Sequence, residues 1–445
     1  HGPGLRTAHF TTALARAGHE VLVLYVGGGN GAELLPMLET AAGDRLGAKC
    51  VAVSEGDFGR AKLREMVERF DPDAMVGAGA PASALAARLG LDLPLWADIF
   101  GDPMAEAQAK AASQGNDACL PRFWSMLGPV LERADRFSAV SEAQAHALVG
   151  QLGLGGRLSR LTAGERLVDV IPCAAEAAGE GGTRERAPLA LPRGAFVVLS
   201  SGSYNTWCDV ETLFHGLDAA MSANPDIHFV SSGGGVAGHD ENSYANFCRM
   251  VSASRHSSRF HLLGWLDSDL MAGLYALADV GLVVERDLYE RRLGSENRVV
   301  QWMVHGLPCL TTGLSEFGAS LVGGGLAFGC ASGDPGALAA TLAGLARDRR
   351  PVAAAGAACR REAALRYDYQ STAGPLLDWC RQPLRARDAR GARPLSLGLF
   401  SEPAAVVHLL EAYLAGLSLG QLGYRSLRWF SRRLSGRGLR RPGCD

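Results

Sequence analysis

Short apolar runs alternate with helical patterns along most of this chain. Val21 to Val26, Phe196 to Leu199 and Val280 to Val284 are examples of such runs, and stretches with apolar residues three and four positions apart lie between them. Strands that are apolar on both faces and joined by helices form parallel sheets with helices on both sides. The sequence therefore predicts an α/β fold, in which ligands bind beyond the carboxyl ends of the strands.

The length of the chain indicates more than one domain. A single hydrophobic core stops growing at about 250–300 residues, and this chain has 445. The apolar run from Leu167 ends at Pro172, and a segment rich in Ala, Gly, Glu and Arg precedes the next strand, which begins at Phe196. The predicted parts are a first Rossmann-like domain at 1–173, a linker at 174–194, a second Rossmann-like domain at 195–366, a cross-over helix at 367–385 and a basic helical tail at 386–445.

The sequence opens on glycines and then a helical pattern. Gly2 and Gly4 precede apolar residues at helical spacing, and the apolar run from Val21 follows. A glycine loop that opens a helix normally follows a strand, so we expect a strand to precede residue 1. An ordinary tight turn is one interpretation of this stretch.

Composition narrows the class of protein. The net charge of −2 gives no overall field that would attract nucleic acid. The ten cysteines are scattered without a Cys-x-x-Cys pair, which favours free thiols in a reducing cytoplasm over disulfides or a zinc site. We find no apolar run long enough to span a membrane and no signal peptide, so we expect a cytoplasmic location.

The stretch from Glu290 to Thr312 carries the clearest functional pattern. It predicts a loop at 291–295, a helix from Glu296 that ends at Gly306, and a short buried strand. Arg298 lies in the first turn of that helix. Free backbone N–H groups and the helix dipole favour an anion at such a helix start, and a guanidinium adds a forked donor.

This stretch resembles the donor-binding motif of glycosyltransferases with the B-type fold, and in particular the retaining family that includes glycogen-synthase-like enzymes. The motif often reads Asn-Lys-x-x-Glu-Tyr-x-x-x-Gly-x-Pro. The matching positions here are Asn297, Arg298, Gln301, Trp302, Gly306 and Pro308. Two carboxylates of the family are absent, because Gln301 and Leu293 stand in their places, and Glu290 is the candidate replacement for the first.

The resemblance implies two facing Rossmann-like domains (GT-B type) around an interdomain cleft, with a nucleotide-sugar donor on the C-terminal domain. It also implies that the loop with Gly2, Gly4 and Arg6 faces this cleft on the acceptor side, with the tight turn as the alternative. It implies donor-binding roles for Gly202, Ser203, Trp265, Glu290, Asn297, Arg298 and Gln301. The loop that contains Gly202 lacks the Lys or Arg that relatives usually have there. Trp265 is expected either to stack on the nucleobase or to pack in the core.

Asp98 and Glu106 are the candidate catalytic residues. Asp98 directly follows a predicted strand, so it lies where acceptor chemistry is expected, and Glu106 follows one turn into the next helix. Either carboxylate could receive the acceptor hydroxyl or its proton. The alternative for both is helix capping and dipole chemistry, which we expect for Asp102, before Pro103.

We expect no metal or other cofactor. Asp267-Ser268-Asp269 spells a metal-binding motif of a different glycosyltransferase fold, but it precedes a helical pattern, so capping is the better interpretation. The predicted function is a metal-independent glycosyltransferase, with retention implied by the resemblance. A non-catalytic nucleotide-sugar-binding homologue, a sugar-nucleotide epimerase and a phosphorylase stay open as alternatives. A dinucleotide-dependent dehydrogenase is disfavoured, since no strand is followed by Gly-x-Gly-x-x-Gly with a downstream acid.

The C-terminal tail is rich in arginine. Within 420–441, Leu427, Phe430 and Leu434 share a helical face flanked by Arg425, Arg428, Arg432 and Arg433. A basic amphipathic helix can lie on an anionic membrane, and a solvated or disordered tail is the alternative. The acceptor is accordingly expected to be a glycan, a lipid-linked molecule or a small molecule, and peripheral contact would place the protein at the inner face of the membrane.

Overall fold

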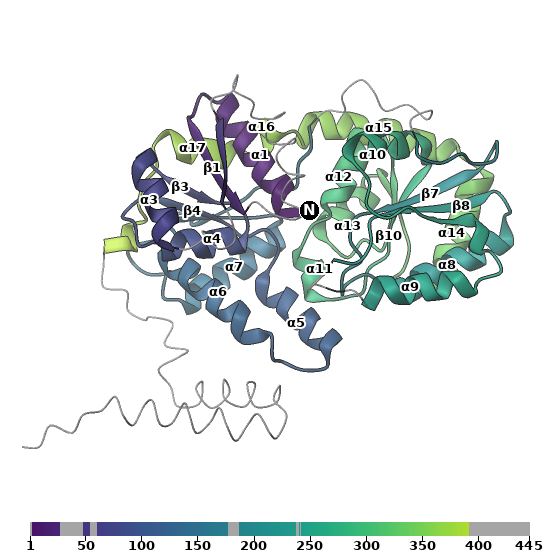
Figure 1. The fold of residues 1–445 in the computed structure, drawn as a ribbon, viewed down its shortest axis with the longest axis horizontal. Coiled ribbons are helices and arrows are strands. Elements are labelled where there is room, and N and C mark those ends of the chain that lie inside the picture. The colour runs from purple at the N-terminus through teal and green to yellow at the C-terminus, as the bar shows by residue number, and fades with distance from the viewer. Residues whose placement is uncertain are drawn as a thin grey trace, which may run out of the picture.

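A computed structural model describes most of the chain. The described residues are 2–26, 48–53, 60–176, 187–236, 240 and 242–390. They form two α/β domains that lie side by side (Figure 1). Residues 391–445 of the predicted tail, with its membrane-contact segment 420–441, lie outside the described residues, as does part of the predicted linker.

Parallel strands form the centre of the N-terminal domain. One sheet pairs β1 (Val21–Val26) with β2 (Ala48–Val53), and a second has the order β3 (Met75–Gly77), β4 (Leu95–Asp98), β5 (Arg136–Ala139) and β6 (Val168–Val170). The helices are α1 (Gly2–Arg16), α3 (Arg60–Phe70), α4 (Ala80–Arg88), α5 (Pro103–Gln114), α6 (Leu120–Arg133) and α7 (Glu142–Leu154). Every residue of β4 is buried, as expected for a strand covered on both faces.

The C-terminal domain has one parallel sheet of six strands. Their order is β12 (Ala327–Gly329), β11 (Cys309–Thr311), β10 (Val280–Val283), β7 (Phe196–Ser201), β8 (Ile227–Ser232) and β9 (Phe260–Leu262). Its helices are α8 (Val210–Ala223), α9 (Asn242–Ala253), α10 (Ser268–Leu277), α11 (Tyr289–Leu293), α12 (Asn297–Val304), α13 (Glu316–Gly323) and α14 (Pro335–Arg347). The chain winds outward from β7 in both directions, so the strand order reverses there. Ligands bind at such a switch point, beyond the carboxyl ends of the central strands.

The two domains touch along a seam. Phe100, two residues beyond β4, packs against the core of the C-terminal domain. Ser141, at the N-cap of α7, donates its hydroxyl to the carbonyl of Leu293 at 2.8 Å. The Ala143 N–H donates to the Glu316 carboxylate at 3.0 Å. The carboxyl end of β4 therefore points toward the C-terminal domain.

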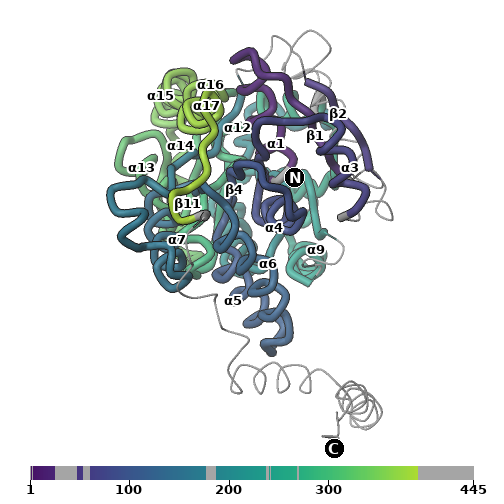
Figure 2. Tube along the Cα trace, turned by 90° about the vertical axis from the view of Figure 1, so that its left-hand side faces the viewer, coloured from purple at the N-terminus to yellow at the C-terminus, as the bar shows by residue number. Residues whose placement is uncertain are grey.

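The chain returns to the N-terminal domain after α15 (Arg350–Arg366), which packs against α12. The short helix α16 (Tyr369–Thr372) then lies against α1, and α17 (Gly374–Arg381) continues along this domain (Figure 2). His9 of α1 and the Thr372 hydroxyl lie 2.8 Å apart. Burial and the nearby Arg6 lower the pKa of His9 to about 3, so this histidine is neutral when it joins the two segments.

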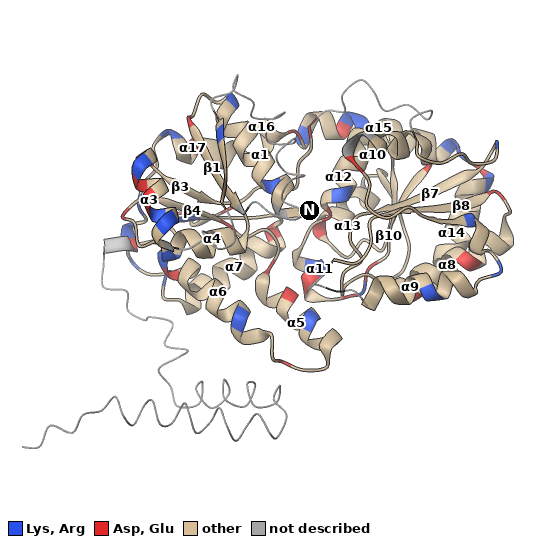
Figure 3. Ribbon diagram, in the orientation of Figure 1, with Lys and Arg blue, Asp and Glu red and all other residues tan. Residues whose placement is uncertain are grey.

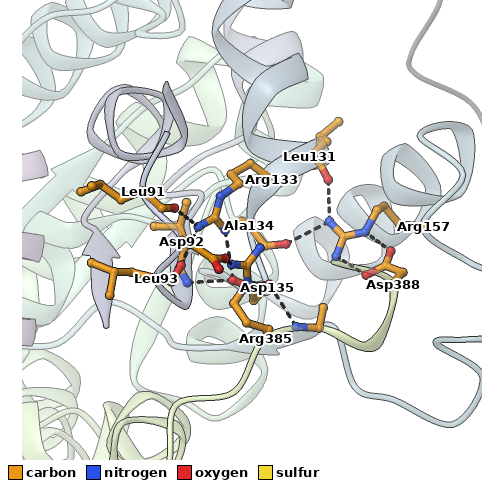
Figure 4. A network of polar contacts seen from close by, with 12 residues as sticks. Leu91, Asp92, Leu93, Leu131, Arg133, Ala134, Asp135, Arg157, Arg385 and Asp388 are labelled. Atoms are coloured by element: carbon orange, nitrogen blue, oxygen red, sulfur yellow. Dashed lines mark hydrogen bonds and ion pairs between the residues drawn. The ribbon is translucent and has the colours of Figure 1, made fainter. Parts of the chain in front are cut away.

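A buried polar network fixes the end of the described chain on the N-terminal domain (Figure 4). Arg157 and Asp388 form a nearly fully buried ion pair, with Nη2 of Arg157 3.1 Å from Oδ1 of Asp388. Nη1 of the same guanidinium donates to two backbone carbonyls at 2.7 and 2.9 Å. Arg385 binds Asp135 at 3.1 Å. The residues after α17 are thus held to the N-terminal domain by charge-assisted hydrogen bonds.

The fold class predicted from the sequence is confirmed, and two local predictions are wrong. No loop surrounds Gly2 and Gly4, because α1 begins at Gly2. Pro3 is compatible with this start, since proline is tolerated in the first turn of a helix. The loop predicted at 291–295 is partly helix α11, whose Arg291 is buried among carboxylates. None of the described helices has the length and apolar character needed to cross a membrane.

Candidate functional site

Arg298 lies beside the loop that follows β7. Its Nη2 donates to the carbonyl of Ser203 at 3.3 Å. A Cβ atom placed on Gly202 would be 3.5 Å from the guanidinium carbon. The structure therefore brings together Gly202, Ser203 and Arg298, which the sequence places almost a hundred residues apart. The cation that this loop itself lacks is supplied by α12.

The Arg298 guanidinium has the properties of an anion-binding group. It is half-buried, and among the described residues it forms no ion pair with a carboxylate. It lies in the first turn of α12, whose N-cap Glu296 makes no side-chain capping bond, so N–H groups at this helix start stay available. A half-buried cation and a helix start at the carboxyl edge of the sheet together form a site suited to phosphate.

Two glycines allow the loop after β7 and the loop after β8 to approach each other closely beside Arg298. Gly202 has a φ of 97°, and Gly233, after β8, has a φ of 110°. A Cβ on Gly233 would come within 2.1 Å of the Gly202 carbonyl oxygen. Gly202 therefore requires glycine for its backbone angle, and Gly233 requires it for the backbone angle and for the close approach.

We expect Gly202→Ala to weaken anion binding and folding together. The strained backbone costs about 1–2 kcal/mol, and the loop that shifts to relieve the strain is in contact with the Arg298 guanidinium. Urea unfolding and calorimetric titration with inorganic pyrophosphate measure the two effects. Gly150→Ala is the control, because it lies inside α7 with open space around it. Equal behaviour of the two variants would contradict the role given to Gly202.

Four charged residues, three of them glutamates, form a buried cluster next to this site, which we call the acidic cluster. Glu285 follows β10, Glu290 and Arg291 belong to α11, and Glu296 precedes α12; each is at most 6% exposed. Arg291 binds both oxygens of Glu290 and one oxygen of Glu285, the latter at 3.0 Å. One arginine thus faces three carboxyl groups. Glu290, the candidate replacement for a family carboxylate, is already engaged by its neighbour in sequence.

Unpartnered polar atoms gather at this edge of the sheet. Glu285 and Glu296 each have one buried carboxylate oxygen without a hydrogen-bond partner in the described structure. The hydroxyls of Thr206 and Thr312 and the side-chain nitrogen of Asn297 are in the same state. Such groups are costly unless something pairs with them. Five of them, on segments that follow β7, β10 and β11, are what a ligand rich in hydroxyl groups could satisfy.

Glu296 makes folding depend on pH. Burial and the neighbouring Glu285 raise the pKa of Glu296 to about 8. Between roughly pH 4.5 and 8 the unfolded chain has lost this proton and the folded protein retains it. The free energy of unfolding therefore falls as pH rises through that window, with a slope of at most about 1.4 kcal/mol per pH unit.

We expect Glu296→Gln to remove this contribution. Urea unfolding at pH 5, 7 and 9 gives the free energy of unfolding of the variant and of the wild type. As pH rises, the variant should become more stable relative to the wild type. A difference that is constant across these pH values would show that Glu296 titrates normally in the folded protein.

The other predicted donor-site residues lie on neighbouring segments. Gln301 is half-buried, one turn beyond Arg298 on α12. Trp265 follows β9 and is 51% exposed, so the alternative of a packed core tryptophan is wrong. Asp267 occupies the N-cap position of α10, but its side chain makes no capping hydrogen bond to the described part of that helix. Among the described residues, no three His, Cys, Asp or Glu side chains are arranged to hold a metal ion.

On the other side of the seam, Asp98 is fully buried beneath Arg6. Arg6 donates to both carboxylate oxygens of Asp98, at 2.7 and 3.1 Å, and the Ser138 hydroxyl donates to one of them at 2.7 Å. Arg6 also donates to the carbonyls of Ile171 and Pro172. Arg6 is therefore a buried residue of α1 rather than part of an open loop, and it holds the ends of β4 and β6 together.

Glu106 lies closer to solvent. Its side chain is 31% exposed and forms an ion pair with Lys110 at 2.8 Å on α5. Helix α5 packs against α11 across the seam, and charged residues of both signs are found on these two helices (Figure 3). The negative charge of Glu106 helps to raise the pKa of Glu290, although burial of Glu290 contributes more. Glu106 and the acidic cluster therefore face each other from different domains.

The structure divides the predicted residues into three groups. Gly202, Ser203, Asn297, Arg298 and Gln301 come together at the start of α12, and Arg6 and Asp98 pair with each other. Trp265 lies on the loop after β9, and the carbonyl of the preceding Gly264 accepts from the Gly233 N–H at 2.6 Å, next to Gly202. Sequence reasoning missed Glu285, Glu296 and Thr206. For Glu285, the signal in the sequence was its position directly after the apolar run Val280 to Val284.

The chain is similar to known proteins in two respects: the sequence of its first 162 residues matches a known domain, and its overall fold matches solved structures. Residues 1–162 match the model of the glycosyl transferase 4-like domain. HepE from Anabaena, solved with UDP and glucose, superposes with a TM-score of 0.59 at 16% identity, over 83% of this chain and 95% of HepE. Sucrose-phosphate synthase from Thermosynechococcus elongatus gives 0.60 at 15% identity, over 81% and 98%.

A glycosyltransferase from Rickettsia africae gives a TM-score of 0.57 at 14% identity, over 85% of this chain and 94% of that protein. No curated protein sequence matches the chain. At identities this low, the structural superpositions establish the fold alone. The match of residues 1–162 to the glycosyl transferase 4-like domain adds the enzyme class. The chain is a glycosyltransferase of the GT-B fold, with a glycosyl transferase 4-like domain at residues 1–162.

Proposed function

We propose that this enzyme transfers a sugar from a nucleotide-sugar to an acceptor hydroxyl. The observation that carries the proposal is Arg298, a half-buried guanidinium with no carboxylate partner among the described residues, at the start of α12. The donor's diphosphate would lie against Arg298 and the amides near Gly202 and Ser203. HepE has been solved with UDP-glucose, and its fold is shared by this chain. That likeness supports a nucleotide-sugar as the donor.

Arg298 and the amides near Gly202 and Ser203 would stabilise the leaving group, which is the nucleoside diphosphate. As the bond between sugar and phosphate breaks, negative charge grows on the nucleoside diphosphate. A fixed cation and oriented N–H groups stabilise that charge without reorganising. The unpartnered atoms of Glu285, Glu296, Asn297 and the two threonines would take the sugar's hydroxyl groups. The pKa of Glu296, raised to about 8, would keep this carboxyl neutral near the diphosphate at pH 7.

The acceptor side centres on Glu106 rather than Asp98. Glu106 is partly exposed at the seam, and Asp98 has no exposed surface and is saturated by Arg6 and Ser138. A group that receives a proton must be reachable by the acceptor. We therefore propose Glu106 as the residue that contacts the acceptor, and Asp98 as a residue that shapes the site from beneath.

Retention of configuration and independence from metal are part of the proposal. One related fold is that of trehalose-6-phosphate synthase, whose structure was described in work on glycosyl transfer with retention. NMR of the first product formed would show the anomer, and an inverted product would exclude retention. Activity that survives EDTA is the expected result for a transferase in which Arg298 replaces a metal; complete loss reversed by Mg²⁺ would exclude it.

The donor is tested by thermal shift against UDP, GDP, ADP and their common sugar conjugates. We expect one nucleotide series to raise the melting temperature, and its sugar conjugate to be turned over with release of nucleotide only when an acceptor is present. Release of no nucleotide with any acceptor would favour a non-catalytic binding homologue. Interconversion of sugars without an acceptor would indicate an epimerase.

A lipid-linked acceptor is proposed from the tail sequence. The basic, amphipathic segment 420–441 would bring the enzyme to an anionic bilayer. Liposomes with anionic lipid are expected to bind the full chain and not a chain that lacks residues 395–445. Equal binding of the two chains would exclude the tail as the contact.

A further inference from the structure

The acidic cluster carries more negative charge than its arginine balances. Glu285, Glu290 and Glu296 share one guanidinium, that of Arg291, and all four residues are at most 6% exposed. Arg291 is bound to Glu285 and to both oxygens of Glu290. Glu296 instead accepts from the Ser315 hydroxyl at 2.7 Å. An ion pair that only fixed α11 to the sheet would not need this third carboxyl group, whose burial is costly.

Two oxygens of the acidic cluster are open to a further partner. Glu285 Oε2 and Glu296 Oε1 have no hydrogen-bond partner in the described structure, although these residues are only 5% and 4% exposed. An ionised carboxylate can only accept hydrogen bonds, so the partner that suits these oxygens is a donor. An ammonium group brings three N–H donors together with the positive charge that the cluster lacks.

The acidic cluster lies between the donor phosphate site and the acceptor side. Glu296 directly precedes α12, whose first turn carries Arg298. Burial raises the pKa of the Cys208 thiol, Arg298 lowers it and Glu285 raises it, so this thiol lies close to both the cation and the cluster. On the other side, α5, which carries Glu106, packs against α11 of the cluster. A sugar that leaves a diphosphate at Arg298 for an acceptor at Glu106 therefore passes beside the cluster.

We propose that the acidic cluster selects the donor by charge: it favours a sugar that carries an amino group and rejects a hexuronic acid. The inference rests on the proposed function, because it assigns the sugar of the same donor. A protonated amine would donate to the open oxygens of Glu285 and Glu296. The carboxylate of a hexuronic acid would bring a further negative charge to a buried site whose arginine, Arg291, is already engaged. Like charges at short range in such a site repel strongly.

Glu296 allows the site to adapt to the charge of its ligand. Burial and the neighbouring Glu285 raise the pKa of Glu296 to about 8, so near pH 7 this carboxyl holds a proton. A neutral sugar would then meet a neutral Glu296. An ammonium group would displace that proton to the solvent and face a carboxylate instead. The groups that face Glu296 from neighbouring segments are Glu285, Arg291, Ser315, Cys173 and Cys309.

A metal ion is the competing partner for the open oxygens. Hard cations such as Ca²⁺ and Mg²⁺ need about six oxygen ligands around one point. In the part of the chain that the structure describes, no three His, Cys, Asp or Glu side chains are arranged to hold an ion. An ammonium group needs only acceptors within hydrogen-bond reach, so it fits the acidic cluster better.

The test uses ligands without a nucleobase, so that the result does not depend on the base. They are the α-1-phosphate esters of glucose, glucosamine and glucuronic acid, and phosphorus NMR titration of the full chain gives their dissociation constants. We expect the glucosamine ester to bind about tenfold more tightly than the glucose ester, and the glucuronic acid ester about tenfold more weakly, as for unit charges several ångströms apart near a protein surface. Both ratios should persist in about 0.5 M salt, because buried charges are screened little.

Two neutral variants locate the selection. Glu285→Gln is expected to bring both ratios to about threefold or less, and Glu296→Gln to do so only for the ratio that measures the amine. Asp287→Asn is the matched control, because Asp287 is exposed and paired with Arg292 on the surface, and it should leave both ratios unchanged. Urea unfolding checks the fold of each variant.

The possible failures of the inference and of the proposed function are distinct. Equal dissociation constants for the three esters, together with weaker binding of all three to Arg298→Ala, would overturn the inference and leave the proposed function standing. If neither the esters nor inorganic pyrophosphate bound to the chain, the proposed function would fall, and the inference with it.

Discussion

Asp98→Ala is expected to lower the free energy of unfolding by about 3–5 kcal/mol, the usual cost of removing one partner from a buried ion pair. Asp98 has no exposed surface, and its two oxygens accept three hydrogen bonds from Arg6 and Ser138. The substitution would leave a guanidinium that is only 1% exposed without its counter-charge. Arg6 also holds Ile171 and Pro172, so β4 and β6 should loosen together.

Urea unfolding measures the loss, with Asp117→Ala on the exposed loop after α5 as the matched control. Arg6→Met combined with Asp98→Leu removes both charges, and this double variant is expected to recover part of the stability, because the Ile171 and Pro172 carbonyls still lose their donor. Asp98→Ala with wild-type stability and a kcat at least a hundredfold lower would show instead that the carboxylate acts on the acceptor.

Arg298→Ala is expected to weaken binding of the preferred nucleoside diphosphate by about 1.5–3 kcal/mol, the range for a hydrogen bond to a charged group. The dissociation constant would rise roughly 10- to 150-fold. Folding should change little, because the side chain makes one long hydrogen bond, to the Ser203 carbonyl, and no ion pair among the described residues. Calorimetric titration gives the affinity, and urea unfolding checks the fold.

Arg292→Ala is the matched control for Arg298→Ala. Arg292 lies a few residues away, but it is exposed and paired with Asp287 on the surface. Its loss should leave nucleotide affinity unchanged. Similar losses in the two variants would indicate a general electrostatic effect in place of a specific phosphate contact.

Local sequence patterns predicted what depends on local chemistry. The apolar runs predicted parallel strands because such strands are buried on both faces, and Asp102 was expected at an N-cap, where its carboxylate accepts from the Ala105 N–H at 2.8 Å. Arg298 was expected in the first turn of a helix, and it lies in the first turn of α12. These features need no knowledge of distant contacts.

Distant contacts decided what the sequence could not show. Asp98 was correctly expected at the end of a strand, but its burial depends on Arg6, 92 residues earlier in the chain. Helix α11 forms where a loop was expected, since Arg291 is buried between Glu285 and Glu290. Tertiary ion pairing of this kind overrides the weak preferences of a short segment.

The same limit applies to the acidic cluster. The sequence shows Gln301 and Leu293 where relatives carry carboxylates. It does not show that Glu285 and Glu296, from other positions, become buried at the same edge of the sheet with oxygens left unpartnered. Their proximity arises from the placement of β10 next to β11 and from the short path into α12.

The most direct test of a diphosphate site at Arg298 is a thermodynamic cycle. Calorimetric titration of wild type and Arg298→Ala with the nucleoside diphosphate and the corresponding monophosphate gives four affinities. Removing the terminal phosphate should cost the wild type about 1.5–3 kcal/mol and cost the variant less than about 0.5 kcal/mol, the limit within which independent changes add. An equal cost in both proteins would mean that Arg298 does not bind the diphosphate, and the account of the donor site would fall.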